Sequence, residues 1–120
     1  MLASIVGSSD DMIVSKTLDG IIASYNKPAE RIMGYSEAEI IGGHIRTIIP
    51  RSRLVEETYI INQIRNGQKV DHFESFRLTQ GGKEIPLSIT VSPILDRKGE
   101  IIGASKIARD ITDKRKAEKP

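Results

Sequence analysis

The clearest pattern in this sequence is an alternation of apolar and polar residues within Glu84–Leu95. Apolar side chains occupy every second position along its first part: Ile85, Leu87, Ile89 and Val91. A period of two places such residues on one face of a β-strand. The sequence therefore predicts a strand over Glu84–Leu95 with one face against a hydrophobic core.

Four further segments favour strands because they contain many β-branched residues and end at turn residues. These segments are Met12–Lys16, Ile21–Tyr25, Val70–Thr79 and Glu100–Arg109. The Asp19-Gly20 dipeptide predicts a hairpin between the first two segments. Gly103 lies in the last segment, where the missing side chain permits another part of the chain to approach closely.

Helical signals are confined to the middle of the chain, and capping residues bound them. Asn26 is expected to cap a helix over Lys27–Met33 that ends at Gly34. Ser36 and Glu39 have the spacing of a capping box, which predicts a second short helix. Short helices in succession indicate a connection that passes over the face of a sheet.

A longer helix is predicted over Ser52–Asn66, between Pro50 and Gly67. Its stripe toward the sheet is expected to contain the residues at helical spacing: Leu54, Thr58, Ile60, Ile61 and Ile64. Polar side chains are assigned to the solvent side: Arg53, Glu56, Gln63 and Arg65. Glu56 and Glu57 are adjacent and therefore point to different faces of the helix, so we interpret both as solvated rather than as paired catalytic carboxylates.

The order of these elements is two strands, a run of helices and three strands. This order predicts an α+β domain with a five-stranded antiparallel sheet, one face of which is covered by short helices and one longer helix. The 120 residues fit a single domain, and the 20 isoleucines agree with a buried sheet.

Charge and residue usage exclude several classes of function. The net charge is only +2 and the basic residues are scattered, which does not indicate a nucleic-acid-binding protein. We assign the basic run Lys114–Lys116 to a solvated helix surface. No apolar run is long enough to span a membrane and no signal peptide is recognisable, so a cytoplasmic location without direct membrane contact is expected. The absence of cysteine excludes disulfides, thiolate metal sites and cysteine nucleophiles.

Several stretches of the chain, in their order and spacing, resemble the PAS domains (sensory-box type) of bacterial and archaeal histidine kinases and diguanylate cyclases. The stretches are Leu18–Ile22, Tyr25–Glu30, Gly34–Ser36, Ile41–Pro50, Gly82–Pro93 and the closing Asp110-Ile111-Thr112. The resemblance implies a PAS sensory domain over residues 1–112 and the start of a charged helical linker to a downstream effector over residues 113–120. It also implies a homodimer in which the domain itself has no catalytic activity.

The resemblance also suggests cofactors, and the sequence argues against the common ones. Haem-binding relatives carry a ligating histidine about seven residues after a proline, but the matching position after Pro50 is Glu57. His44 and His72 lie elsewhere and are interpreted as structural or surface residues, and no metal site is expected. A covalent flavin adduct needs a cysteine, and the few aromatic residues are a poor supply for stacking a flavin.

The remaining candidate site is an apolar pocket between the longer helix and the sheet, suited to a small apolar or amphipathic ligand. Its candidate lining residues are Ile61, Phe76, Ile89, Val91 and Ile107. Ordinary core packing would have the same composition. Two hypotheses therefore stay open, namely a ligand-responsive sensor and a ligand-free dimerisation and relay module. For either, Asp110 and Thr112 are the candidate relay residues, because they can fix the angle at which the chain leaves the last strand.

Overall fold

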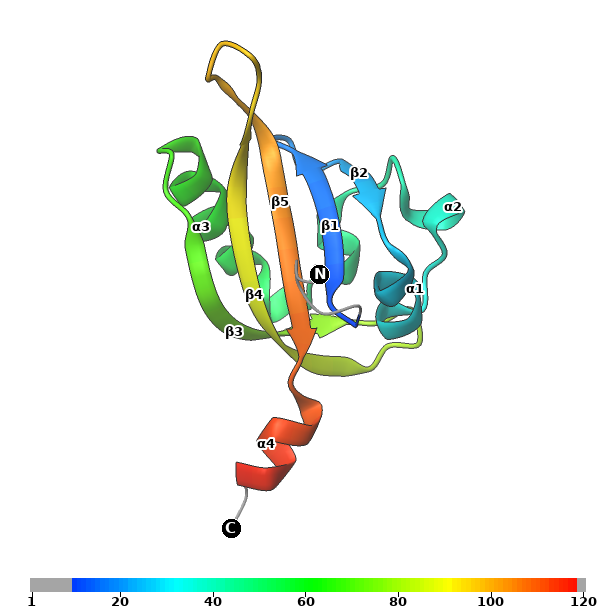
Figure 1. Cartoon of the computed structure of the whole chain (residues 1–120). Coiled ribbons are helices and arrows are strands. Elements are labelled where there is room, and N and C mark those ends of the chain that lie inside the picture. The colour runs from blue at the N-terminus through cyan, green and yellow to red at the C-terminus, as the bar shows by residue number, and fades with distance from the viewer. Residues whose placement is uncertain (1–9, 119–120) are drawn as a thin grey trace, which may run out of the picture.

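The computed structural model describes residues 10–118, which form one antiparallel sheet with helices on one side (Figure 1). Its strands are β1 (Met12–Thr17), β2 (Ile22–Tyr25), β3 (Val70–Leu78), β4 (Glu84–Leu95) and β5 (Ile101–Asp110). The five predicted strands and the α+β class are thus confirmed. The predicted domain boundaries include residues 1–9 and 119–120, which lie outside the described part of the chain, and those boundaries stay a prediction.

The strands are arranged in the order β2-β1-β5-β4-β3, and each pair of neighbours is antiparallel. This order places β5, the last strand, at the centre of the sheet between the first strand and β4. A residue on β5 therefore reaches the middle of the face that the helices cover. The same strand ends where α4 begins, so the centre of the sheet and the exit of the chain belong to one element.

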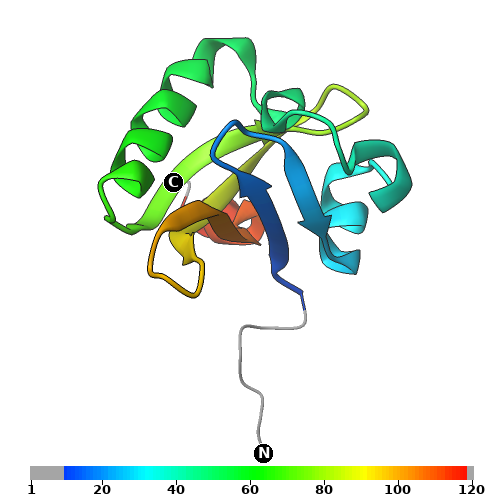
Figure 2. The same cartoon turned by 90° about the horizontal axis from the view of Figure 1, so that it is seen from above.

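The helices between β2 and β3 cover a single face of the sheet, as the view from above shows (Figure 2). They are α1 (Lys27–Met33), α2 (Glu37–Ile40), the 3-10 helices η1 (Ile45–Ile48) and η2 (Arg51–Arg53), and α3 (Leu54–Arg65). The final helix, α4 (Thr112–Glu118), projects from the end of β5. The short helices have the caps that local sequence predicts. The Asn26 side chain accepts a hydrogen bond at the start of α1, and Ser36 and Glu39 form a complete capping box on α2.

The core lies between these helices and the inner face of the sheet. The alternating residues of β4 are buried as predicted. None of them is more than 6% exposed to solvent: Ile85, Leu87, Ile89 and Val91. Gly103 of β5 is needed for close packing, because a Cβ atom there would lie 2.5 Å from the carbonyl oxygen of Lys16 on β1. The close approach expected at this glycine is therefore made by the neighbouring strand.

The predicted inner stripe of α3 was partly wrong. Ile60 and Ile64 are buried, but Leu54 and Thr58 are exposed. Glu56 and Glu57, predicted to be solvated, are instead only half-exposed or less and turn toward the sheet. The helix is rotated relative to the prediction because the sheet below offers cationic partners for these two carboxylates.

Candidate functional site

The inner face of the sheet beneath α3 carries three buried cationic side chains. They come from three strands: Lys16 from β1, Arg77 from β3 and Lys106 from β5. Lys16 and Lys106 are each 3% exposed and Arg77 is fully buried. Buried cations are rare unless they are paired, because removing a charge from water is unfavourable. We therefore take this cluster as the candidate functional site.

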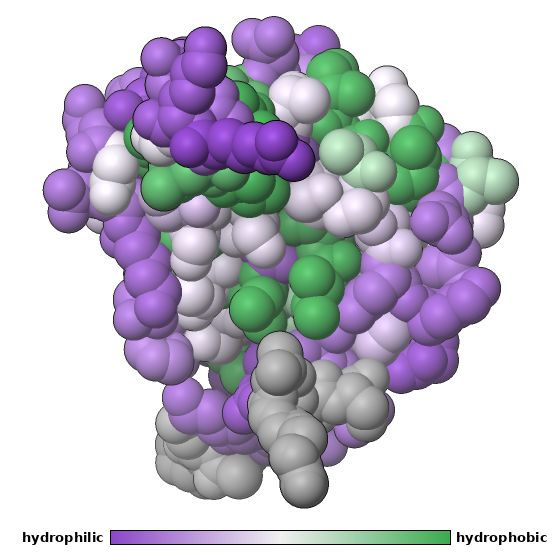
Figure 3. All heavy atoms as spheres, turned by 45° about the horizontal axis from the view of Figure 1, so that its top comes forward, coloured by the Kyte–Doolittle hydropathy of each residue, from purple (hydrophilic) through white to green (hydrophobic). Residues whose placement is uncertain are grey.

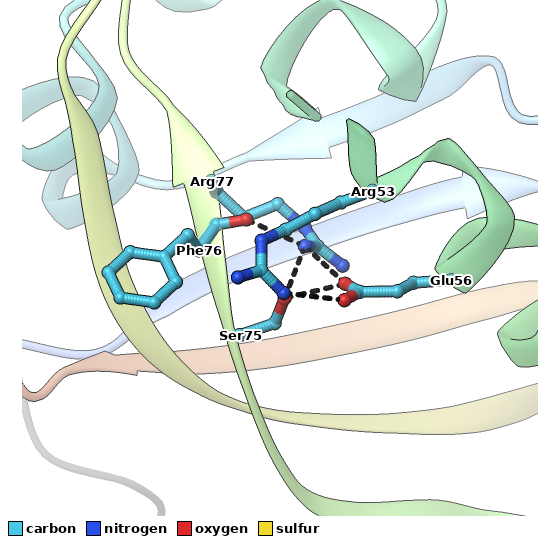
Figure 4. A network of polar contacts seen from close by, with 5 residues as sticks. All are labelled: Arg53, Glu56, Ser75, Phe76 and Arg77. Atoms are coloured by element: carbon cyan, nitrogen blue, oxygen red, sulfur yellow. Dashed lines mark hydrogen bonds and ion pairs between the residues drawn. The ribbon is translucent and has the colours of Figure 1, made fainter. Parts of the chain in front are cut away.

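Glu56 of α3 is the centre of a polar network that joins the helix to β3 (Figure 4). Its carboxylate accepts hydrogen bonds from Arg77 Nη1 at 2.9 Å, Ser75 Oγ at 2.5 Å and Arg53 Nη1 at 2.8 Å. Burial by itself would raise the pKa of Glu56, but these three donors outweigh it and the pKa is lowered. Glu56 is therefore an ionised anchor that holds the start of α3 on the edge strand.

Glu57 makes the corresponding contact on the other side of the helix. Its carboxylate accepts a hydrogen bond from the ammonium group of Lys16, whose side chain is 2% exposed. Burial lowers the pKa of Lys16, while the charge and the hydrogen bond of Glu57 oppose that effect. Two adjacent carboxylates thus attach α3 to β3 and to β1, on opposite sides of the central strands.

Lys106 stands between these two ion pairs without a partner of its own. It lies on the central strand, where its neighbours in register are Val14 of β1 and Val91 of β4. Among the described residues its ammonium group makes no hydrogen bond or ion pair. Burial, followed by the positive charges of Arg77 and Lys16, places the pKa of Lys106 well below its ordinary value. The site therefore contains one more buried cationic side chain than it has carboxylates.

The structure brings only some of the predicted pocket residues together. Ile89 and Val91 lie on the buried inner face, and Ile61 is half-buried on α3. Phe76 alternates with Ser75 and Arg77 and so belongs to the opposite side of β3, and Ile107 is 38% exposed on the outer face of β5. Two of the five candidates thus lie away from the space under the helix, because their positions have the wrong parity along their strands.

Sequence reasoning missed the charged residues of the site, although a signal for them was present. Lys16 has the parity of Met12 and Val14 along β1, and Lys106 has that of Ala104 and Ala108 along β5. The alternation of inward and outward positions along each strand therefore predicts that both lysines face the core. This signal was overlooked because lysine is normally a surface residue.

A small cavity of about 190 Å³ opens beside α3, next to the Lys16–Glu57 pair. Its lining residues include Leu18, Gly20, His44, Glu57, Thr58 and Ile61. His44 packs against Gly20, where a Cβ atom would lie 2.6 Å from the imidazole ring, and its Nδ1 caps η1 by accepting from the Arg46 amide. These contacts agree with the structural role expected for this histidine.

His72 is an exposed residue with φ of 51°, in a bulge of β3. Within residues 10–118 no group of three or more histidine and acidic side chains is placed to hold a metal ion. In the same part of the chain no helix is long and apolar enough to cross a membrane.

The exit of the chain from the sheet is held by the residues predicted to act there. Asp110 accepts hydrogen bonds from the Thr112 amide at 2.9 Å and from the Thr112 hydroxyl at 2.6 Å. Ile111, between them, is buried and donates its amide to the Pro86 carbonyl of β4 at 3.1 Å. The turn from β5 into α4 is thus fixed to the sheet rather than free.

Phe76 contacts both the network beneath α3 and the exit helix. The guanidinium of Arg53 lies 5.0 Å from the centre of the Phe76 ring, and that of Arg115 on α4 lies 5.3 Å from it. Glu74, two residues earlier on β3, accepts from Lys114 of α4 at 3.0 Å. A short path of contacts therefore joins Glu56 through Arg53 and Phe76 to α4.

A second, larger cavity lies close to the same exit. Its volume is about 460 Å³, and it is open to solvent between the end of α1, the turn from β3 to β4 and Asp110. Arg31 and Lys83 contribute positive charges to its walls. Its lining includes the buried residues Met33 and Ile85, but the charged residues that line it are exposed.

The sequence profile of a family described as PAS domain matches residues 10–113. The chain is also 28% identical, over 124 aligned positions, to the signal transduction histidine-protein kinase AtoS of Escherichia coli (strain K12). That match covers 92% of this chain but only 19% of the kinase, so the chain spans about a fifth of that protein.

Solved structures have the same fold. The crystal structure of the PAS domain of a protein from Colwellia psychrerythraea has a TM-score of 0.80 and 28% identity, covering 87% of this chain and 88% of that one. An RNA-binding Light-Oxygen-Voltage receptor has a TM-score of 0.79 at 22% identity, covering 89% of this chain and 31% of the receptor. The light-state dimer of the fungal blue-light photoreceptor Vivid has a TM-score of 0.72 at 16% identity, with coverages of 91% and 83%. The last two likenesses show the fold alone.

Proposed function

This chain belongs to the PAS domain family, and from this membership we propose that it is a non-catalytic sensory and relay domain that controls a histidine kinase effector. In this proposal a small ligand held beneath α3 changes how the helix sits on the sheet. The change then passes to α4 and to the effector that follows it. A relay of this kind is an equilibrium between two conformations that a ligand shifts through its different affinity for them.

The observation that carries the proposal is the set of contacts around Phe76. Arg53 belongs to the network beneath α3, Arg115 belongs to α4, and both guanidinium groups lie over the same ring. A shift of α3 that displaces Arg53 would therefore alter the surface on which α4 packs. Asp110 fixes the start of α4 and so converts such a change into a change of direction.

The choice of a histidine kinase as effector rests on the likeness to AtoS. The chain covers 92% of its own length in that comparison, and the matched kinase is a signal transduction protein. A diguanylate cyclase remains the other effector consistent with the family resemblance of the sequence.

The proposal is tested in a chimera in which this chain replaces the matching region of AtoS. Asp110→Ala and Phe76→Leu are each expected to change the rate of kinase autophosphorylation, because they loosen the two contacts that orient α4. Asp96→Ala is the matched control, since Asp96 also caps a turn through its side chain but lies in the β4–β5 turn, away from α4. Thermal melting of each isolated domain checks that the variants fold.

If Asp110→Ala and Phe76→Leu leave the autophosphorylation rate equal to that of the Asp96→Ala control, the relay assignment is wrong. If both variants change the rate and the control does not, the exit contacts transmit a signal to the effector.

A second candidate function, a ligand-free dimerisation and relay module, is favoured by the outer face of the sheet. Figure 3 shows apolar side chains in the middle of this otherwise mostly polar face. Ile13 of β1 and Ile107 of β5 are paired across the strands there, and Ile107 is 38% exposed. Native mass spectrometry of protein purified from cells separates the two functions: a dimer without added mass supports the module, and a bound small molecule supports the sensor.

A further inference from the structure

The cavity of about 460 Å³ at the exit of the chain is lined by charged groups of both signs and by apolar side chains. Its charged residues are Arg31 on α1, Lys83 in the turn before β4 and Asp110 at the end of β5. Its apolar side chains are those of Ile32, Met33 and Ile85. The volume lies within the range of roughly 300–1,000 Å³ that is usual for small-molecule sites. None of its described lining residues belongs to α3, so this cavity is separate from the space beneath that helix.

Backbone hydrogen bonds hold the walls of this cavity in place. The Gln80 amide donates to the Met33 carbonyl at 2.8 Å, which joins the turn between β3 and β4 to the end of α1 (Figure 1). The turn is closed by the Thr79 amide, which donates to the Lys83 carbonyl at 2.8 Å, and by the Lys83 amide, which donates to the Thr79 hydroxyl at 3.2 Å. The walls are therefore formed before a ligand arrives, and binding does not have to order them.

Asp110 and Lys83 bring opposite charges to the cavity without pairing with each other. One carboxylate oxygen of Asp110 accepts both hydrogen bonds from Thr112, and the other oxygen makes no hydrogen bond among residues 10–118. The ammonium group of Lys83 makes no hydrogen bond or ion pair in the same range. Arg31 has one distant ion pair, with Asp10 at 3.8 Å. An acceptor and two cationic groups thus remain for a molecule in the cavity.

We propose that this cavity binds a small α-amino acid with an aliphatic side chain. Its ammonium group is held at the free oxygen of Asp110, and its carboxylate is held by Lys83 and Arg31. Both contacts are charge-assisted, which makes them stronger than hydrogen bonds between neutral groups. The aliphatic side chain packs on the apolar part of the wall at Ile32 and Ile85.

A ligand with only one charge fits this cavity less well. A simple carboxylate leaves the free oxygen of Asp110 without a partner and adds a second negative charge beside it. A simple amine leaves both cationic groups of the wall unpaired and adds a third positive charge. The charged wall residues are exposed, and one exposed ion pair changes an affinity by about fivefold at most. The preference for a zwitterion therefore needs both contacts together.

The cavity lies where the proposed relay leaves the sheet. Asp110 holds the first residue of α4 through Thr112, so an ammonium group on its other oxygen fixes the carboxylate and, with it, the start of the helix. This inference goes beyond the proposed function, in which the ligand lies beneath α3. It adds a second input, which acts on the exit turn directly.

The test is a titration of the 15N-labelled chain with L-leucine, 4-methylpentanoate and 3-methylbutylamine at neutral pH and constant ionic strength. L-leucine carries both charged groups on one aliphatic skeleton, and each of the other two probes lacks one of these groups. L-leucine is expected to shift the amide signals of Gly34, Gln80, Lys83 and Thr112 with saturation. The first three residues line the cavity, or belong to its turn, and the Thr112 amide reports on Asp110. The other two probes are expected to bind about fivefold more weakly or less.

Two variants assign the binding to the proposed groups. Asp110→Asn keeps an oxygen that can accept from Thr112 but removes the charge, so it is expected to weaken L-leucine binding about two- to fivefold and to leave 4-methylpentanoate binding no weaker. Lys83→Met is expected to weaken L-leucine binding by a similar factor and to leave 3-methylbutylamine binding no weaker. A variant that merely disturbs the structure would weaken all three probes. Lys98→Met is the matched control, since Lys98 is exposed in the β4–β5 turn and does not line the cavity.

The proposal is overturned if L-leucine produces no saturable shift, if either singly charged probe binds as tightly as L-leucine, or if the shifted signals belong to α3 instead. It is also overturned if Asp110→Asn and Lys83→Met bind L-leucine as tightly as Lys98→Met does. These failures are distinct from failure of the relay. A chain that binds no amino acid, but whose Asp110→Ala and Phe76→Leu variants change the rate of the chimeric kinase, keeps its relay function and loses only this second input.

Discussion

Replacing Glu57 with glutamine tests whether the ion pair between Lys16 and α3 supports the fold. Glu57→Gln keeps the shape of the side chain and one hydrogen-bond acceptor, but removes the negative charge that faces Lys16. The Lys16 side chain is 2% exposed, so water cannot replace the lost charge. The variant is therefore expected to be clearly less stable than the unchanged chain.

Two limits define the expected size of the effect. If Lys16 stays charged, breaking a buried ion pair on one side costs about 3–5 kcal/mol. If Lys16 instead loses its proton at pH 7, the lost stability cannot exceed the free energy of deprotonating an amine with the ordinary pKa of 10.5. That free energy is about 1.4 kcal/mol per pH unit, or about 5 kcal/mol. Because glutamine keeps an acceptor, we expect about 3 kcal/mol. For a domain of this size that lowers the melting temperature by about 10–15 °C.

Urea and thermal unfolding, followed by circular dichroism, measure this change. Glu74→Gln is the matched control, since Glu74 also pairs with a lysine, Lys114 at 3.0 Å, but at the surface. An exposed pair contributes less than about 1 kcal/mol. Loss of Glu57 should also matter less at high pH, because the pKa of Lys16 is lowered further in the variant and the neutral amine is then easily formed.

The double variant Lys16→Met with Glu57→Leu replaces both charges by apolar groups and should recover most of the lost stability. The reasoning is refuted if Glu57→Gln melts together with Glu74→Gln, or if the double variant is as unstable as the single one.

Two further predictions concern the sheet. Gly103→Ala places a Cβ atom 2.5 Å from the Lys16 carbonyl oxygen, so the strands must move apart. Urea unfolding is expected to show a loss of about 1–3 kcal/mol in stability. The control is Gly81→Ala, whose added Cβ has no closer neighbour than 4.0 Å, and equal stability of the two variants would contradict the prediction. Burial lowers the pKa of Lys106 in the folded state, so the unfolded chain binds more protons and the stability should rise with pH from that lowered value up to about 10.5. Lys106→Met should be more stable than the unchanged chain at neutral pH and should show a smaller rise in alkaline solution, and parallel pH profiles for the two proteins would count against a charged, buried Lys106.

Much of the fold could be predicted because its signals are local. The hydrophobic alternation of β4 and the caps at Asn26 and Ser36 involve residues within a few positions of one another, and the structure confirms them. The face of α3 that packs on the sheet was harder to predict from the sequence. Its apolar residues surround much of the helix, so the predicted stripe combined Leu54, which is exposed, with Ile60 and Ile64, which are buried.

The lining of the candidate pocket was harder still to predict, because a pocket needs residues from several elements to face one space. Ile89 and Val91 were placed correctly on the inner face from the period of one strand. Phe76 and Ile107 were grouped with them on apolar character alone. Their parity along β3 and β5 places them away from the inner face, where one meets α4 and the other lies on the outer surface.

By itself, the sequence determined the class of the domain, the order of its strands and helices, and the turn at Asp110 and Thr112 through which the chain leaves the sheet. Only the tertiary structure decided that Lys16, Arg77 and Lys106 meet beneath Glu56 and Glu57. The physical reason is that burial of a charge depends on its partners, and here the partners are separated along the chain by 41 residues for Lys16 and Glu57 and by 21 for Glu56 and Arg77. Local patterns report the preference of each residue for water, whereas the fold brings together opposite charges that make burial tolerable and leaves Lys106 as the one cation of the cluster without a carboxylate.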